Sequence, residues 1–331
     1  MRRRAEFLLF LTTFVWGSTF VTVKIAMMEV APLLLTSVRF AIACAIAIPI
    51  WHKQIRGIRF SVFKKGLILG LLLSVGFILQ TIGLQMTTAS KTAFITGMMV
   101  VFTPIAQVVI ERRAPRLGNI IGILLVIGGL WLLTSPDGSA FNLGDGLTLM
   151  AAVLFGIYIV YVDVYSKQHD VSQLFFLQLF VTLVVSFGGT LVFEDLSFHP
   201  SSTVLALIIY LAVFATVIST FIQTKYQRET TPTRAVLIFA LEPVIAATLA
   251  YLILDERIGV LGILGGALII SGVLASEFSD SFKKILVWMG WKVEEVPSPL
   301  TPLSTGERGV PTQSGRGEDY ESKARSEPDK V

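Results

Sequence analysis

An acidic residue stands near the middle of a strongly apolar stretch of the chain. Residues 235–257 read AVLIFALEPVIAATLAYLILDER, long enough to cross a bilayer, and Glu242 and Pro243 lie near the centre. A carboxylate costs ~3 kcal/mol at such depth, and a proline removes a backbone donor and interrupts the helix. Desolvation disfavours the charged carboxylate there. We consider two interpretations: a site for substrate and proton coupling, or a neutral Glu242 that bonds the backbone freed by a proline kink.

Arg39 is the only arginine inside an apolar run. Its long side chain could reach outward to the lipid headgroups. Alternatively it faces a cavity as the counter-charge of an anionic ligand group or of Glu242. In the first apolar run, Trp16 lies close to two hydroxyl residues, Ser18 and Thr19, which indicates either ordinary packing or the aromatic wall of a binding site.

Further neutral polar side chains lie within apolar runs and need hydrogen-bond partners. They could bond neighbouring helices or a substrate. Together with the residues above, they give a predicted substrate-binding set of Trp16, Ser18, Thr19, Arg39, Gln80, Gln107, Tyr158, Gln178, Gln223 and Glu242.

The composition indicates a polytopic membrane protein. Hydrophobic residues make up 53% of the chain and charged residues only 15%. The net charge of +4 is typical of membrane topology and contact with anionic lipid rather than nucleic-acid binding. The single cysteine, Cys44, cannot form a disulfide within the chain.

Ten apolar runs are predicted to be membrane-spanning α-helices, because backbone polar groups in lipid must pair within their own segment. They cover residues 7–27, 33–51, 66–86, 90–110, 117–134, 144–165, 172–193, 203–226, 233–254 and 258–276. Lys and Arg are concentrated in alternate connections, and the loops 137–145 and 194–199 contain neither. This bias places both termini in the cytoplasm and the protein in the cell (inner) membrane.

The chain repeats itself. Trp16 and Phe155 open comparable segments 139 positions apart, and Pro104 and Pro243, both predicted helix breaks, have the same spacing. After the prolines the spacing becomes 144, because Gly118, Gly122 and Gly128 match Gly262, Gly266 and Gly272. We therefore expect a small insertion in span nine.

The repeat predicts two domains, residues 7–134 and residues 144–276. Five spans per repeat is an odd number, so the copies must have opposite orientations, which is the architecture of many secondary transporters. The glycines indicate close helix packing, with a homodimer left open. Residues 277–296 resemble an interfacial amphipathic helix. Residues 297–331 cannot form a core, and we expect them to be disordered.

The order and duplication of several short motifs resemble the EamA-type family of the drug/metabolite transporter superfamily. The motifs are WGSTFVTVK at 16–24, Arg39-Phe40, TTASKTAFITGMMVVFTPI at 87–105 and LEPVIAATLAYLILDER at 241–257. The resemblance covers both repeats. It implies a ten-helix, exporter-like fold with a central cavity, and a small polar metabolite such as an amino acid as substrate.

The function expected is gradient-coupled secondary transport by alternating access, most simply export, with proton coupling at Glu242. The partners implied are a small-molecule substrate and the lipid bilayer. An enzyme would need clustered reactive groups at depth, whereas His52, His169 and His199 all lie in loops without metal-ligand spacing. We therefore expect no catalytic residue, no metal and no cofactor. A channel or a non-transporting membrane sensor remains the alternative.

Overall fold

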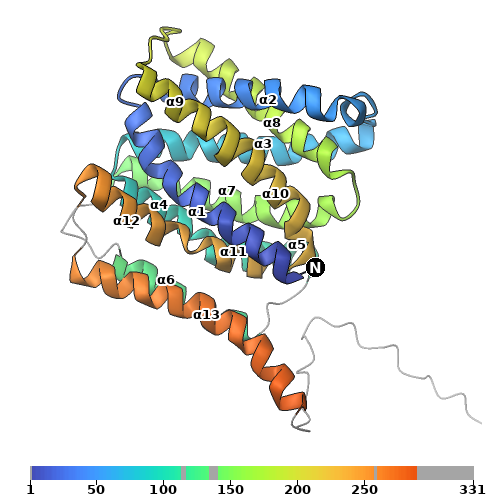
Figure 1. Ribbon diagram of the computed structural model, residues 1–331, viewed down its shortest axis with the longest axis vertical. Helices are drawn as coiled ribbons and strands as arrows, with labels where there is room; N and C mark the ends of the chain where they lie inside the picture. The colour runs from blue at the N-terminus through green and yellow to red at the C-terminus, as the bar shows by residue number, and fades with distance from the viewer. Residues whose placement is uncertain (1, 113–116, 134–140, 257–258, 289–331) are drawn as a thin grey trace, which may run out of the picture.

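The computed structural model describes residues 2–112, 117–133, 141–256 and 259–288, and every regular element in these ranges is helical. Figure 1 shows the helices packed side by side, with α2 and α8 at one edge and the pair α6 and α13 at the other. In chain order the helices are α1 (Arg2–Ala26), α2 (Pro32–Arg56), α3 (Phe60–Gln85), α4 (Ala89–Gly97), α5 (Met99–Glu111), α6 (Leu117–Leu133), α7 (Leu143–Ser166), α8 (Val171–Phe193), α9 (Ser202–Tyr210), the π-helix η1 (Leu211–Ile218), α10 (Ser219–Tyr226), the 3₁₀-helix η2 (Gln227–Glu229), α11 (Pro232–Phe239), α12 (Glu242–Leu254) and α13 (Val260–Trp288).

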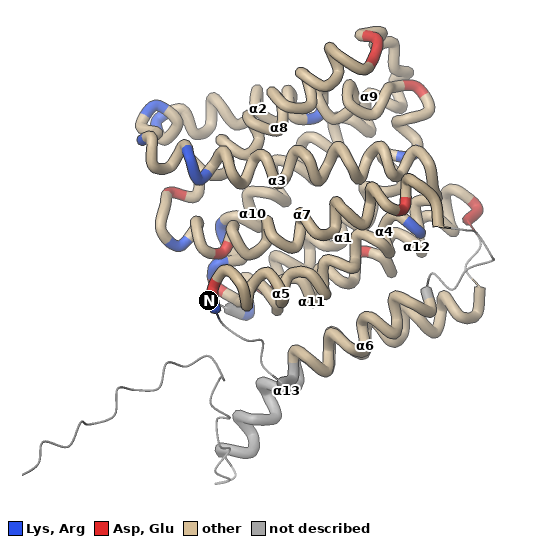
Figure 2. Tube along the Cα trace, turned by 180° about the vertical axis from the view of Figure 1, so that it is seen from behind, with Lys and Arg blue, Asp and Glu red and all other residues tan. Residues whose placement is uncertain are grey.

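The described residues form a multi-pass membrane protein. Eight helical segments are long and apolar enough to cross a membrane, and two further apolar segments, Asn119–Leu132 and Val260–Ala275, are shorter. The shorter ones lie within the predicted fifth and tenth spans, so the count of ten stays a prediction. Figure 2 shows most of the charged residues at the two ends of the helices, with few between them.

Two of the spans are interrupted. α11 ends at Phe239, and α12 begins with Glu242 and Pro243 at its first turn, where the missing amide hydrogen of proline costs nothing. The expected break at Pro243 is therefore present. The expected break at Pro104 is wrong: the interruption lies at Met98, and Pro104 lies inside α5, which continues past it to Glu111.

The two interrupted spans correspond at a spacing of 143 rather than 139. α5 and α12 each have 13 residues, begin at Met99 and Glu242, and stop at a residue with left-handed backbone, Arg112 and Asp255. The insertion expected in span nine is therefore absent. Pro104 lies in the interior of α5, whereas Pro243 lies in the first turn of α12. The two prolines therefore do not occupy corresponding positions, and aligning them gave the wrong spacing.

Glycines allow the first helix of each half to cross the other half closely. A Cβ atom on Gly17 would lie 2.7 Å from Cβ of Ile245 on α12, and one on Gly156 would lie 2.9 Å from Cβ of Phe102 on α5. Real side chains do not approach so closely, so only glycine fits at these crossings of α1 with α12 and of α7 with α5.

Some of the predicted glycines of the fifth and tenth spans lie where α6 packs against α13 within the chain. A Cβ on Gly272 would lie 2.8 Å from the carbonyl oxygen of Gly122. α13 continues without a break to Trp288, so the boundary expected at 276–277 is not a helix end. The rest of the interfacial segment, residues 289–296, and the expected disordered tail, residues 297–331, lie outside the described residues.

Candidate functional site

A pocket with an empty volume of about 590 Å³, part of it open to solvent, lies between helices of both halves of the chain. Sixteen residues line it: Trp16, Thr19, Phe20, Arg39, Leu73, Phe77, Gln80, Thr96, Met99, Phe155, Tyr158, Ile159, Thr220, Gln223, Phe239 and Glu242. Seven of the ten predicted substrate-binding residues are in this set.

The lining is duplicated in sequence. Trp16, Thr19 and Phe20 from α1 each have a partner in the lining 139 positions later, on α7; four residues from α3 to α5 have partners 143 positions later, on α10 to α12. The pairs are Trp16 with Phe155, Thr19 with Tyr158, Phe20 with Ile159, Phe77 with Thr220, Gln80 with Gln223, Thr96 with Phe239, and Met99 with Glu242. Arg39 and Leu73 also line the pocket, but the residues at the corresponding positions of the second half do not. Corresponding positions of the two halves thus face one shared cavity.

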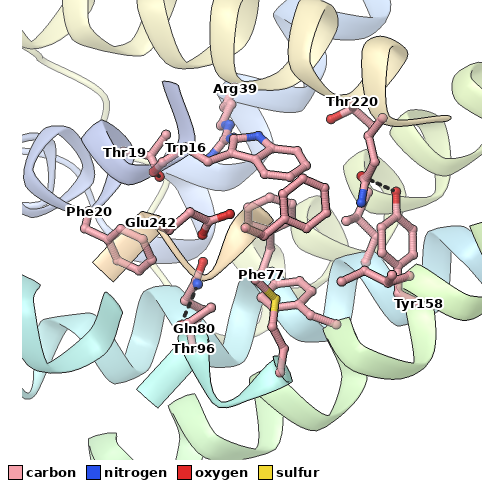
Figure 3. A pocket seen from close by; sticks show the side chains of 16 residues that line it. Trp16, Thr19, Phe20, Arg39, Phe77, Gln80, Thr96, Tyr158, Thr220 and Glu242 are labelled. Atoms are coloured by element: carbon pink, nitrogen blue, oxygen red, sulfur yellow. Dashed lines mark hydrogen bonds between the residues drawn. The ribbon is translucent and has the colours of Figure 1, made fainter. Parts of the chain in front are cut away.

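Glu242 enters the pocket from the interruption between α11 and α12. Its side chain is 5% exposed, and Figure 3 shows the carboxyl group pointing into the space between Arg39 and Gln80. Within the described residues it has no hydrogen-bond or ion-pair partner, so the bond to the freed backbone required by the alternative interpretation is not formed there. The carboxyl group therefore remains available to a ligand or to a proton.

Arg39 reaches the same pocket from α2. Its Nε donates a 2.6 Å hydrogen bond to Oγ1 of Thr216, and the guanidinium lies 4.9 Å from the ring centre of Phe77 and 5.6 Å from that of Phe40. With 5% of the side chain exposed, Arg39 is buried and does not extend to a lipid headgroup. No ion pair within 4.0 Å joins it to Glu242 among the described residues. The pocket therefore contains a guanidinium group and a carboxyl group that do not form an ion pair with each other.

The π-helix η1 supplies both Thr216 and the carbonyl that fixes Trp16. Indole Nε1 of Trp16 donates to the backbone oxygen of Ala215 over 2.9 Å, and the indole packs edge-on against Phe239 at 5.3 Å. A π-helix is rare, and its wider turn leaves backbone groups accessible to side chains. Figure 3 shows Trp16 beside Arg39, so η1 orients the aromatic and the cationic wall together.

Hydrogen bonds among neutral side chains fix the rest of the wall. Tyr158 donates to Oε1 of Gln178 over 2.6 Å, and Gln178 donates to Thr224 over 2.9 Å. On the other side, Gln80 donates to Oγ1 of Thr96 over 2.9 Å. Gln178 is thus a supporting residue behind Tyr158 rather than part of the lining.

Two other predicted residues lie away from the pocket. Ser18 forms a 2.7 Å hydrogen bond with Tyr210 on the opposite side of α1. Gln107 accepts a 2.6 Å hydrogen bond from Thr233 and joins α5 to α11. Gln107 follows the alternative considered from the sequence, a hydrogen bond between helices.

Sequence reasoning missed the apolar part of the lining and two hydroxyl residues. The missed residues are Phe20, Leu73, Phe77, Thr96, Met99, Phe155, Ile159, Thr220 and Phe239. Apolar side chains cannot be distinguished from core residues by composition. The repeat could have found two of them, because Phe155 lies 139 positions after Trp16 and Met99 lies 143 positions before Glu242. The described residues contain no cluster of three or more His, Cys, Asp or Glu that could bind a metal ion.

Comparisons with known proteins agree with this architecture. A protein of Archaeoglobus fulgidus called "Uncharacterized transporter" is 32% identical over 276 residues, covering 82% of this chain and 85% of that protein. The "Probable amino-acid metabolite efflux pump" of Escherichia coli K12 is 26% identical, covering 86% of this chain and 98% of the pump. A solved crystal structure superposes with a TM-score of 0.69 at 17% identity, covering 83% of this chain and 97% of that one, and so shares the fold.

The sequence profile of the EamA-like transporter family matches twice, at residues 3–135 and at residues 142–277. The two matches together span most of the chain and include every residue that lines the pocket. This protein belongs to the EamA-like transporter family.

Proposed function

We propose that the protein is a secondary active exporter of a small zwitterionic metabolite, an amino acid or a close relative, which binds between Arg39 and Glu242. The observation that carries this proposal is the presence of both ionisable groups, each 5% exposed, in one pocket without an ion pair between them. A ligand with a carboxylate and an amine can satisfy both groups at once.

The chemistry of the two residues favours this orientation. The terminal guanidinium nitrogens of Arg39 have no hydrogen-bond acceptor among the described residues, since only Nε is engaged by Thr216. A guanidinium binds a carboxylate through two parallel hydrogen bonds. The opposite carboxylate of Glu242 suits an ammonium group. Desolvated charges are expensive when unpaired, so a ligand that pairs both gains affinity.

The remaining lining suits the apolar part of such a ligand. Trp16, Phe77, Phe155 and Phe239 contribute aromatic surface, and Met99 contributes a flexible thioether. A small polar head between two charges, with an apolar group against aromatic rings, describes many amino acids. The name of the Escherichia coli relative, an amino-acid metabolite efflux pump, supports the same class and the direction of export.

The proposed mechanism is alternating access of two inverted five-helix repeats, residues 7–134 and 144–276, within a ten-helix fold. The constant spacing of the lining pairs supports the repeat, as does the double match of the family profile. A pocket on the axis that relates two such repeats can open to either side of the membrane when the repeats rock against each other.

The proposed orientation places both termini in the cytoplasm of a cell whose inner membrane the protein spans. The bias of Lys and Arg toward alternate connections supports it. Energy comes from a gradient. Because the carboxyl group of Glu242 is unpartnered within the described residues, a proton can replace the substrate amine on it, which couples substrate and proton fluxes.

Ligand binding tests the proposal directly. Purified protein is titrated calorimetrically with amino acids, with their amides, which lack the carboxylate, and with their N-acetyl derivatives, which lack the amine. The wild type should bind only the zwitterions. Arg39→Gln should lose the preference for the free carboxylate, and Glu242→Gln the preference for the free amine. Equal affinity for all three ligand types in the wild type would contradict the proposed site.

A further inference from the structure

Two ion pairs join the halves of the chain at opposite ends of the bundle. Oε1 of Glu6, on α1, lies 3.2 Å from Nη2 of Arg234 on α11. Oδ2 of Asp145, on α7, lies 2.7 Å from Nζ of Lys91 on α4. In each pair the carboxylate belongs to the first helix of one half, and the cation belongs to the interrupted span of the other half.

The two ion pairs correspond to each other in the repeat. Asp145 follows Glu6 by 139 positions, and Arg234 follows Lys91 by 143 positions. These are the spacings that relate the two sides of the pocket. The same contact is therefore made twice, once at each end, with the contributing halves exchanged.

The local structure around the two cations is also duplicated. Thr88 caps α4 by accepting a hydrogen bond from the backbone nitrogen of Lys91, and Thr231 caps α11 in the same way for Arg234. Each cation thus lies in the first turn of a helix, where the helix dipole disfavours positive charge. Each needs a carboxylate nearby, and in both cases this carboxylate comes from the opposite half.

The pocket lies between the two contacts. Glu6 precedes Trp16 by ten positions on α1, and Asp145 precedes Phe155 by ten positions on α7, which is ~15 Å of helix in each case. Arg234 likewise precedes Glu242 by eight positions, or ~12 Å if the span were continuous. An entrance at either end must separate α1 from α11 or α7 from α4, and so must break the ion pair there.

We propose that Glu6–Arg234 and Lys91–Asp145 are the two gates of the transport cycle, each open only while the other is closed. This inference rests on the proposed alternating access and adds the residues that hold each end shut. Both pairs are formed in this structure. A second contact joins the two halves at the Asp145 end. Glu256 accepts hydrogen bonds from the backbone nitrogens of Ala89 and Ser90 over 2.9 and 3.1 Å.

The experiment measures from which side the pocket is reachable. Cys44→Ser removes the only cysteine, and Met99→Cys introduces a reporter in the lining. Right-side-out and inside-out vesicles are treated with a membrane-impermeant maleimide. Glu6→Gln should raise the labelling rate from the Glu6 end relative to the other end by roughly threefold, the effect of a partly exposed ion pair. Lys91→Gln should shift the ratio by a similar factor in the opposite direction.

Matched variants separate gating from loss of fold. Arg234→Gln should reproduce Glu6→Gln, and Asp145→Asn should reproduce Lys91→Gln while keeping an acceptor for the backbone of Asn142. The exchange Glu6→Lys with Arg234→Glu should restore the wild-type ratio. Lys167→Gln removes an ion pair at the C-terminal end of α7, between Lys167 and Asp163, and should leave the ratio unchanged.

An unchanged ratio in all four single variants, or shifts in the same direction from both ends, would overturn the assignment. Labelling needs no substrate, so its outcome is independent of which ligand the pocket binds. If the labelling ratios shift as expected while zwitterions fail to bind, the result supports the two gates and contradicts the proposed substrate.

Discussion

Nε of Arg39 donates a hydrogen bond to Oγ1 of Thr216 over 2.6 Å, which connects α2 to the π-helix η1 across two halves of the protein. Thr216 itself donates to the backbone oxygen of Leu211. It does not line the pocket. Thr216 is thus a positioning residue: it fixes the orientation of the guanidinium whose two terminal nitrogens are left for a ligand.

We expect Thr216→Val to weaken binding of a zwitterionic ligand at least about tenfold, since a hydrogen bond to a charged group contributes ~1.5–3 kcal/mol. Binding of the amide analogue, which lacks the carboxylate, should change little. Calorimetric titration of both ligands measures the difference. Thr248→Val is the matched control, because that exposed hydroxyl bonds only the backbone of its own helix. Equal losses for both ligands would show that Thr216 stabilises the fold rather than orienting Arg39.

Glu242→Gln should separate exchange from coupling. Glutamine keeps the size of the side chain and a carbonyl acceptor but cannot bind or release a proton. In proteoliposomes the variant should still exchange labelled substrate for unlabelled substrate, with weaker affinity, and should lose its response to an imposed pH gradient. Glu229→Gln makes the same chemical change outside the pocket and should respond as the wild type does. Full pH-driven transport by Glu242→Gln would exclude this residue as the coupling site.

Gly17→Ala should destabilise the folded protein, because the new methyl group would lie 2.7 Å from Ile245. Overpacking of this kind costs ~1–3 kcal/mol, so the melting temperature in detergent should fall. Gly156→Ala should behave alike, since its methyl group would lie 2.9 Å from Phe102. Gly188→Ala is the control, because no atom lies within 4 Å of a Cβ atom there. A variant at Gly17 as stable as the one at Gly188 would mean that the α1–α12 crossing is loosely packed.

Reporter fusions test the proposed orientation. Alkaline phosphatase, which is active only outside the cytoplasm, should be active when fused after Gly138 or after Asp195, because the loops there lack Lys and Arg. A fusion after Gly57, which follows the basic end of α2, should be inactive. Activity in the reverse pattern would contradict the proposed orientation.

The sequence predicted the spans and the interruption at Pro243 because both follow from strong local rules, apolar length and the missing amide of proline. The sequence prediction failed where the direction of a side chain decides whether the residue lines the pocket. Ser18 was grouped with Trp16 and Thr19 by proximity, yet at 100° per residue Trp16, Thr19 and Phe20 share one face of α1 and Ser18 lies on another. Periodicity alone would have removed Ser18 and added Phe20.

Other parts of the site could not be derived from local patterns. Gln107 lies more than two helical turns beyond Met99 on α5, and only its tertiary neighbour Thr233 explains it. The π-helix η1 has no sequence signature that distinguishes it from the apolar helix around it. The match of the prolines at a spacing of 139 was a coincidence that only the helix ends could expose.

Met99 and Glu242 occupy corresponding positions of the two halves but differ in chemistry, which is feasible because both halves belong to one chain. A dimer of identical halves would present every substitution twice across its axis, so an acidic side chain at this position would bring two carboxylates into one cavity of about 590 Å³. Like charges so close repel, and one would have to stay protonated. Because Met99 supplies a thioether on one side and Glu242 a carboxyl group on the other, the two sides of the cavity differ. A zwitterionic ligand would therefore bind in one orientation only.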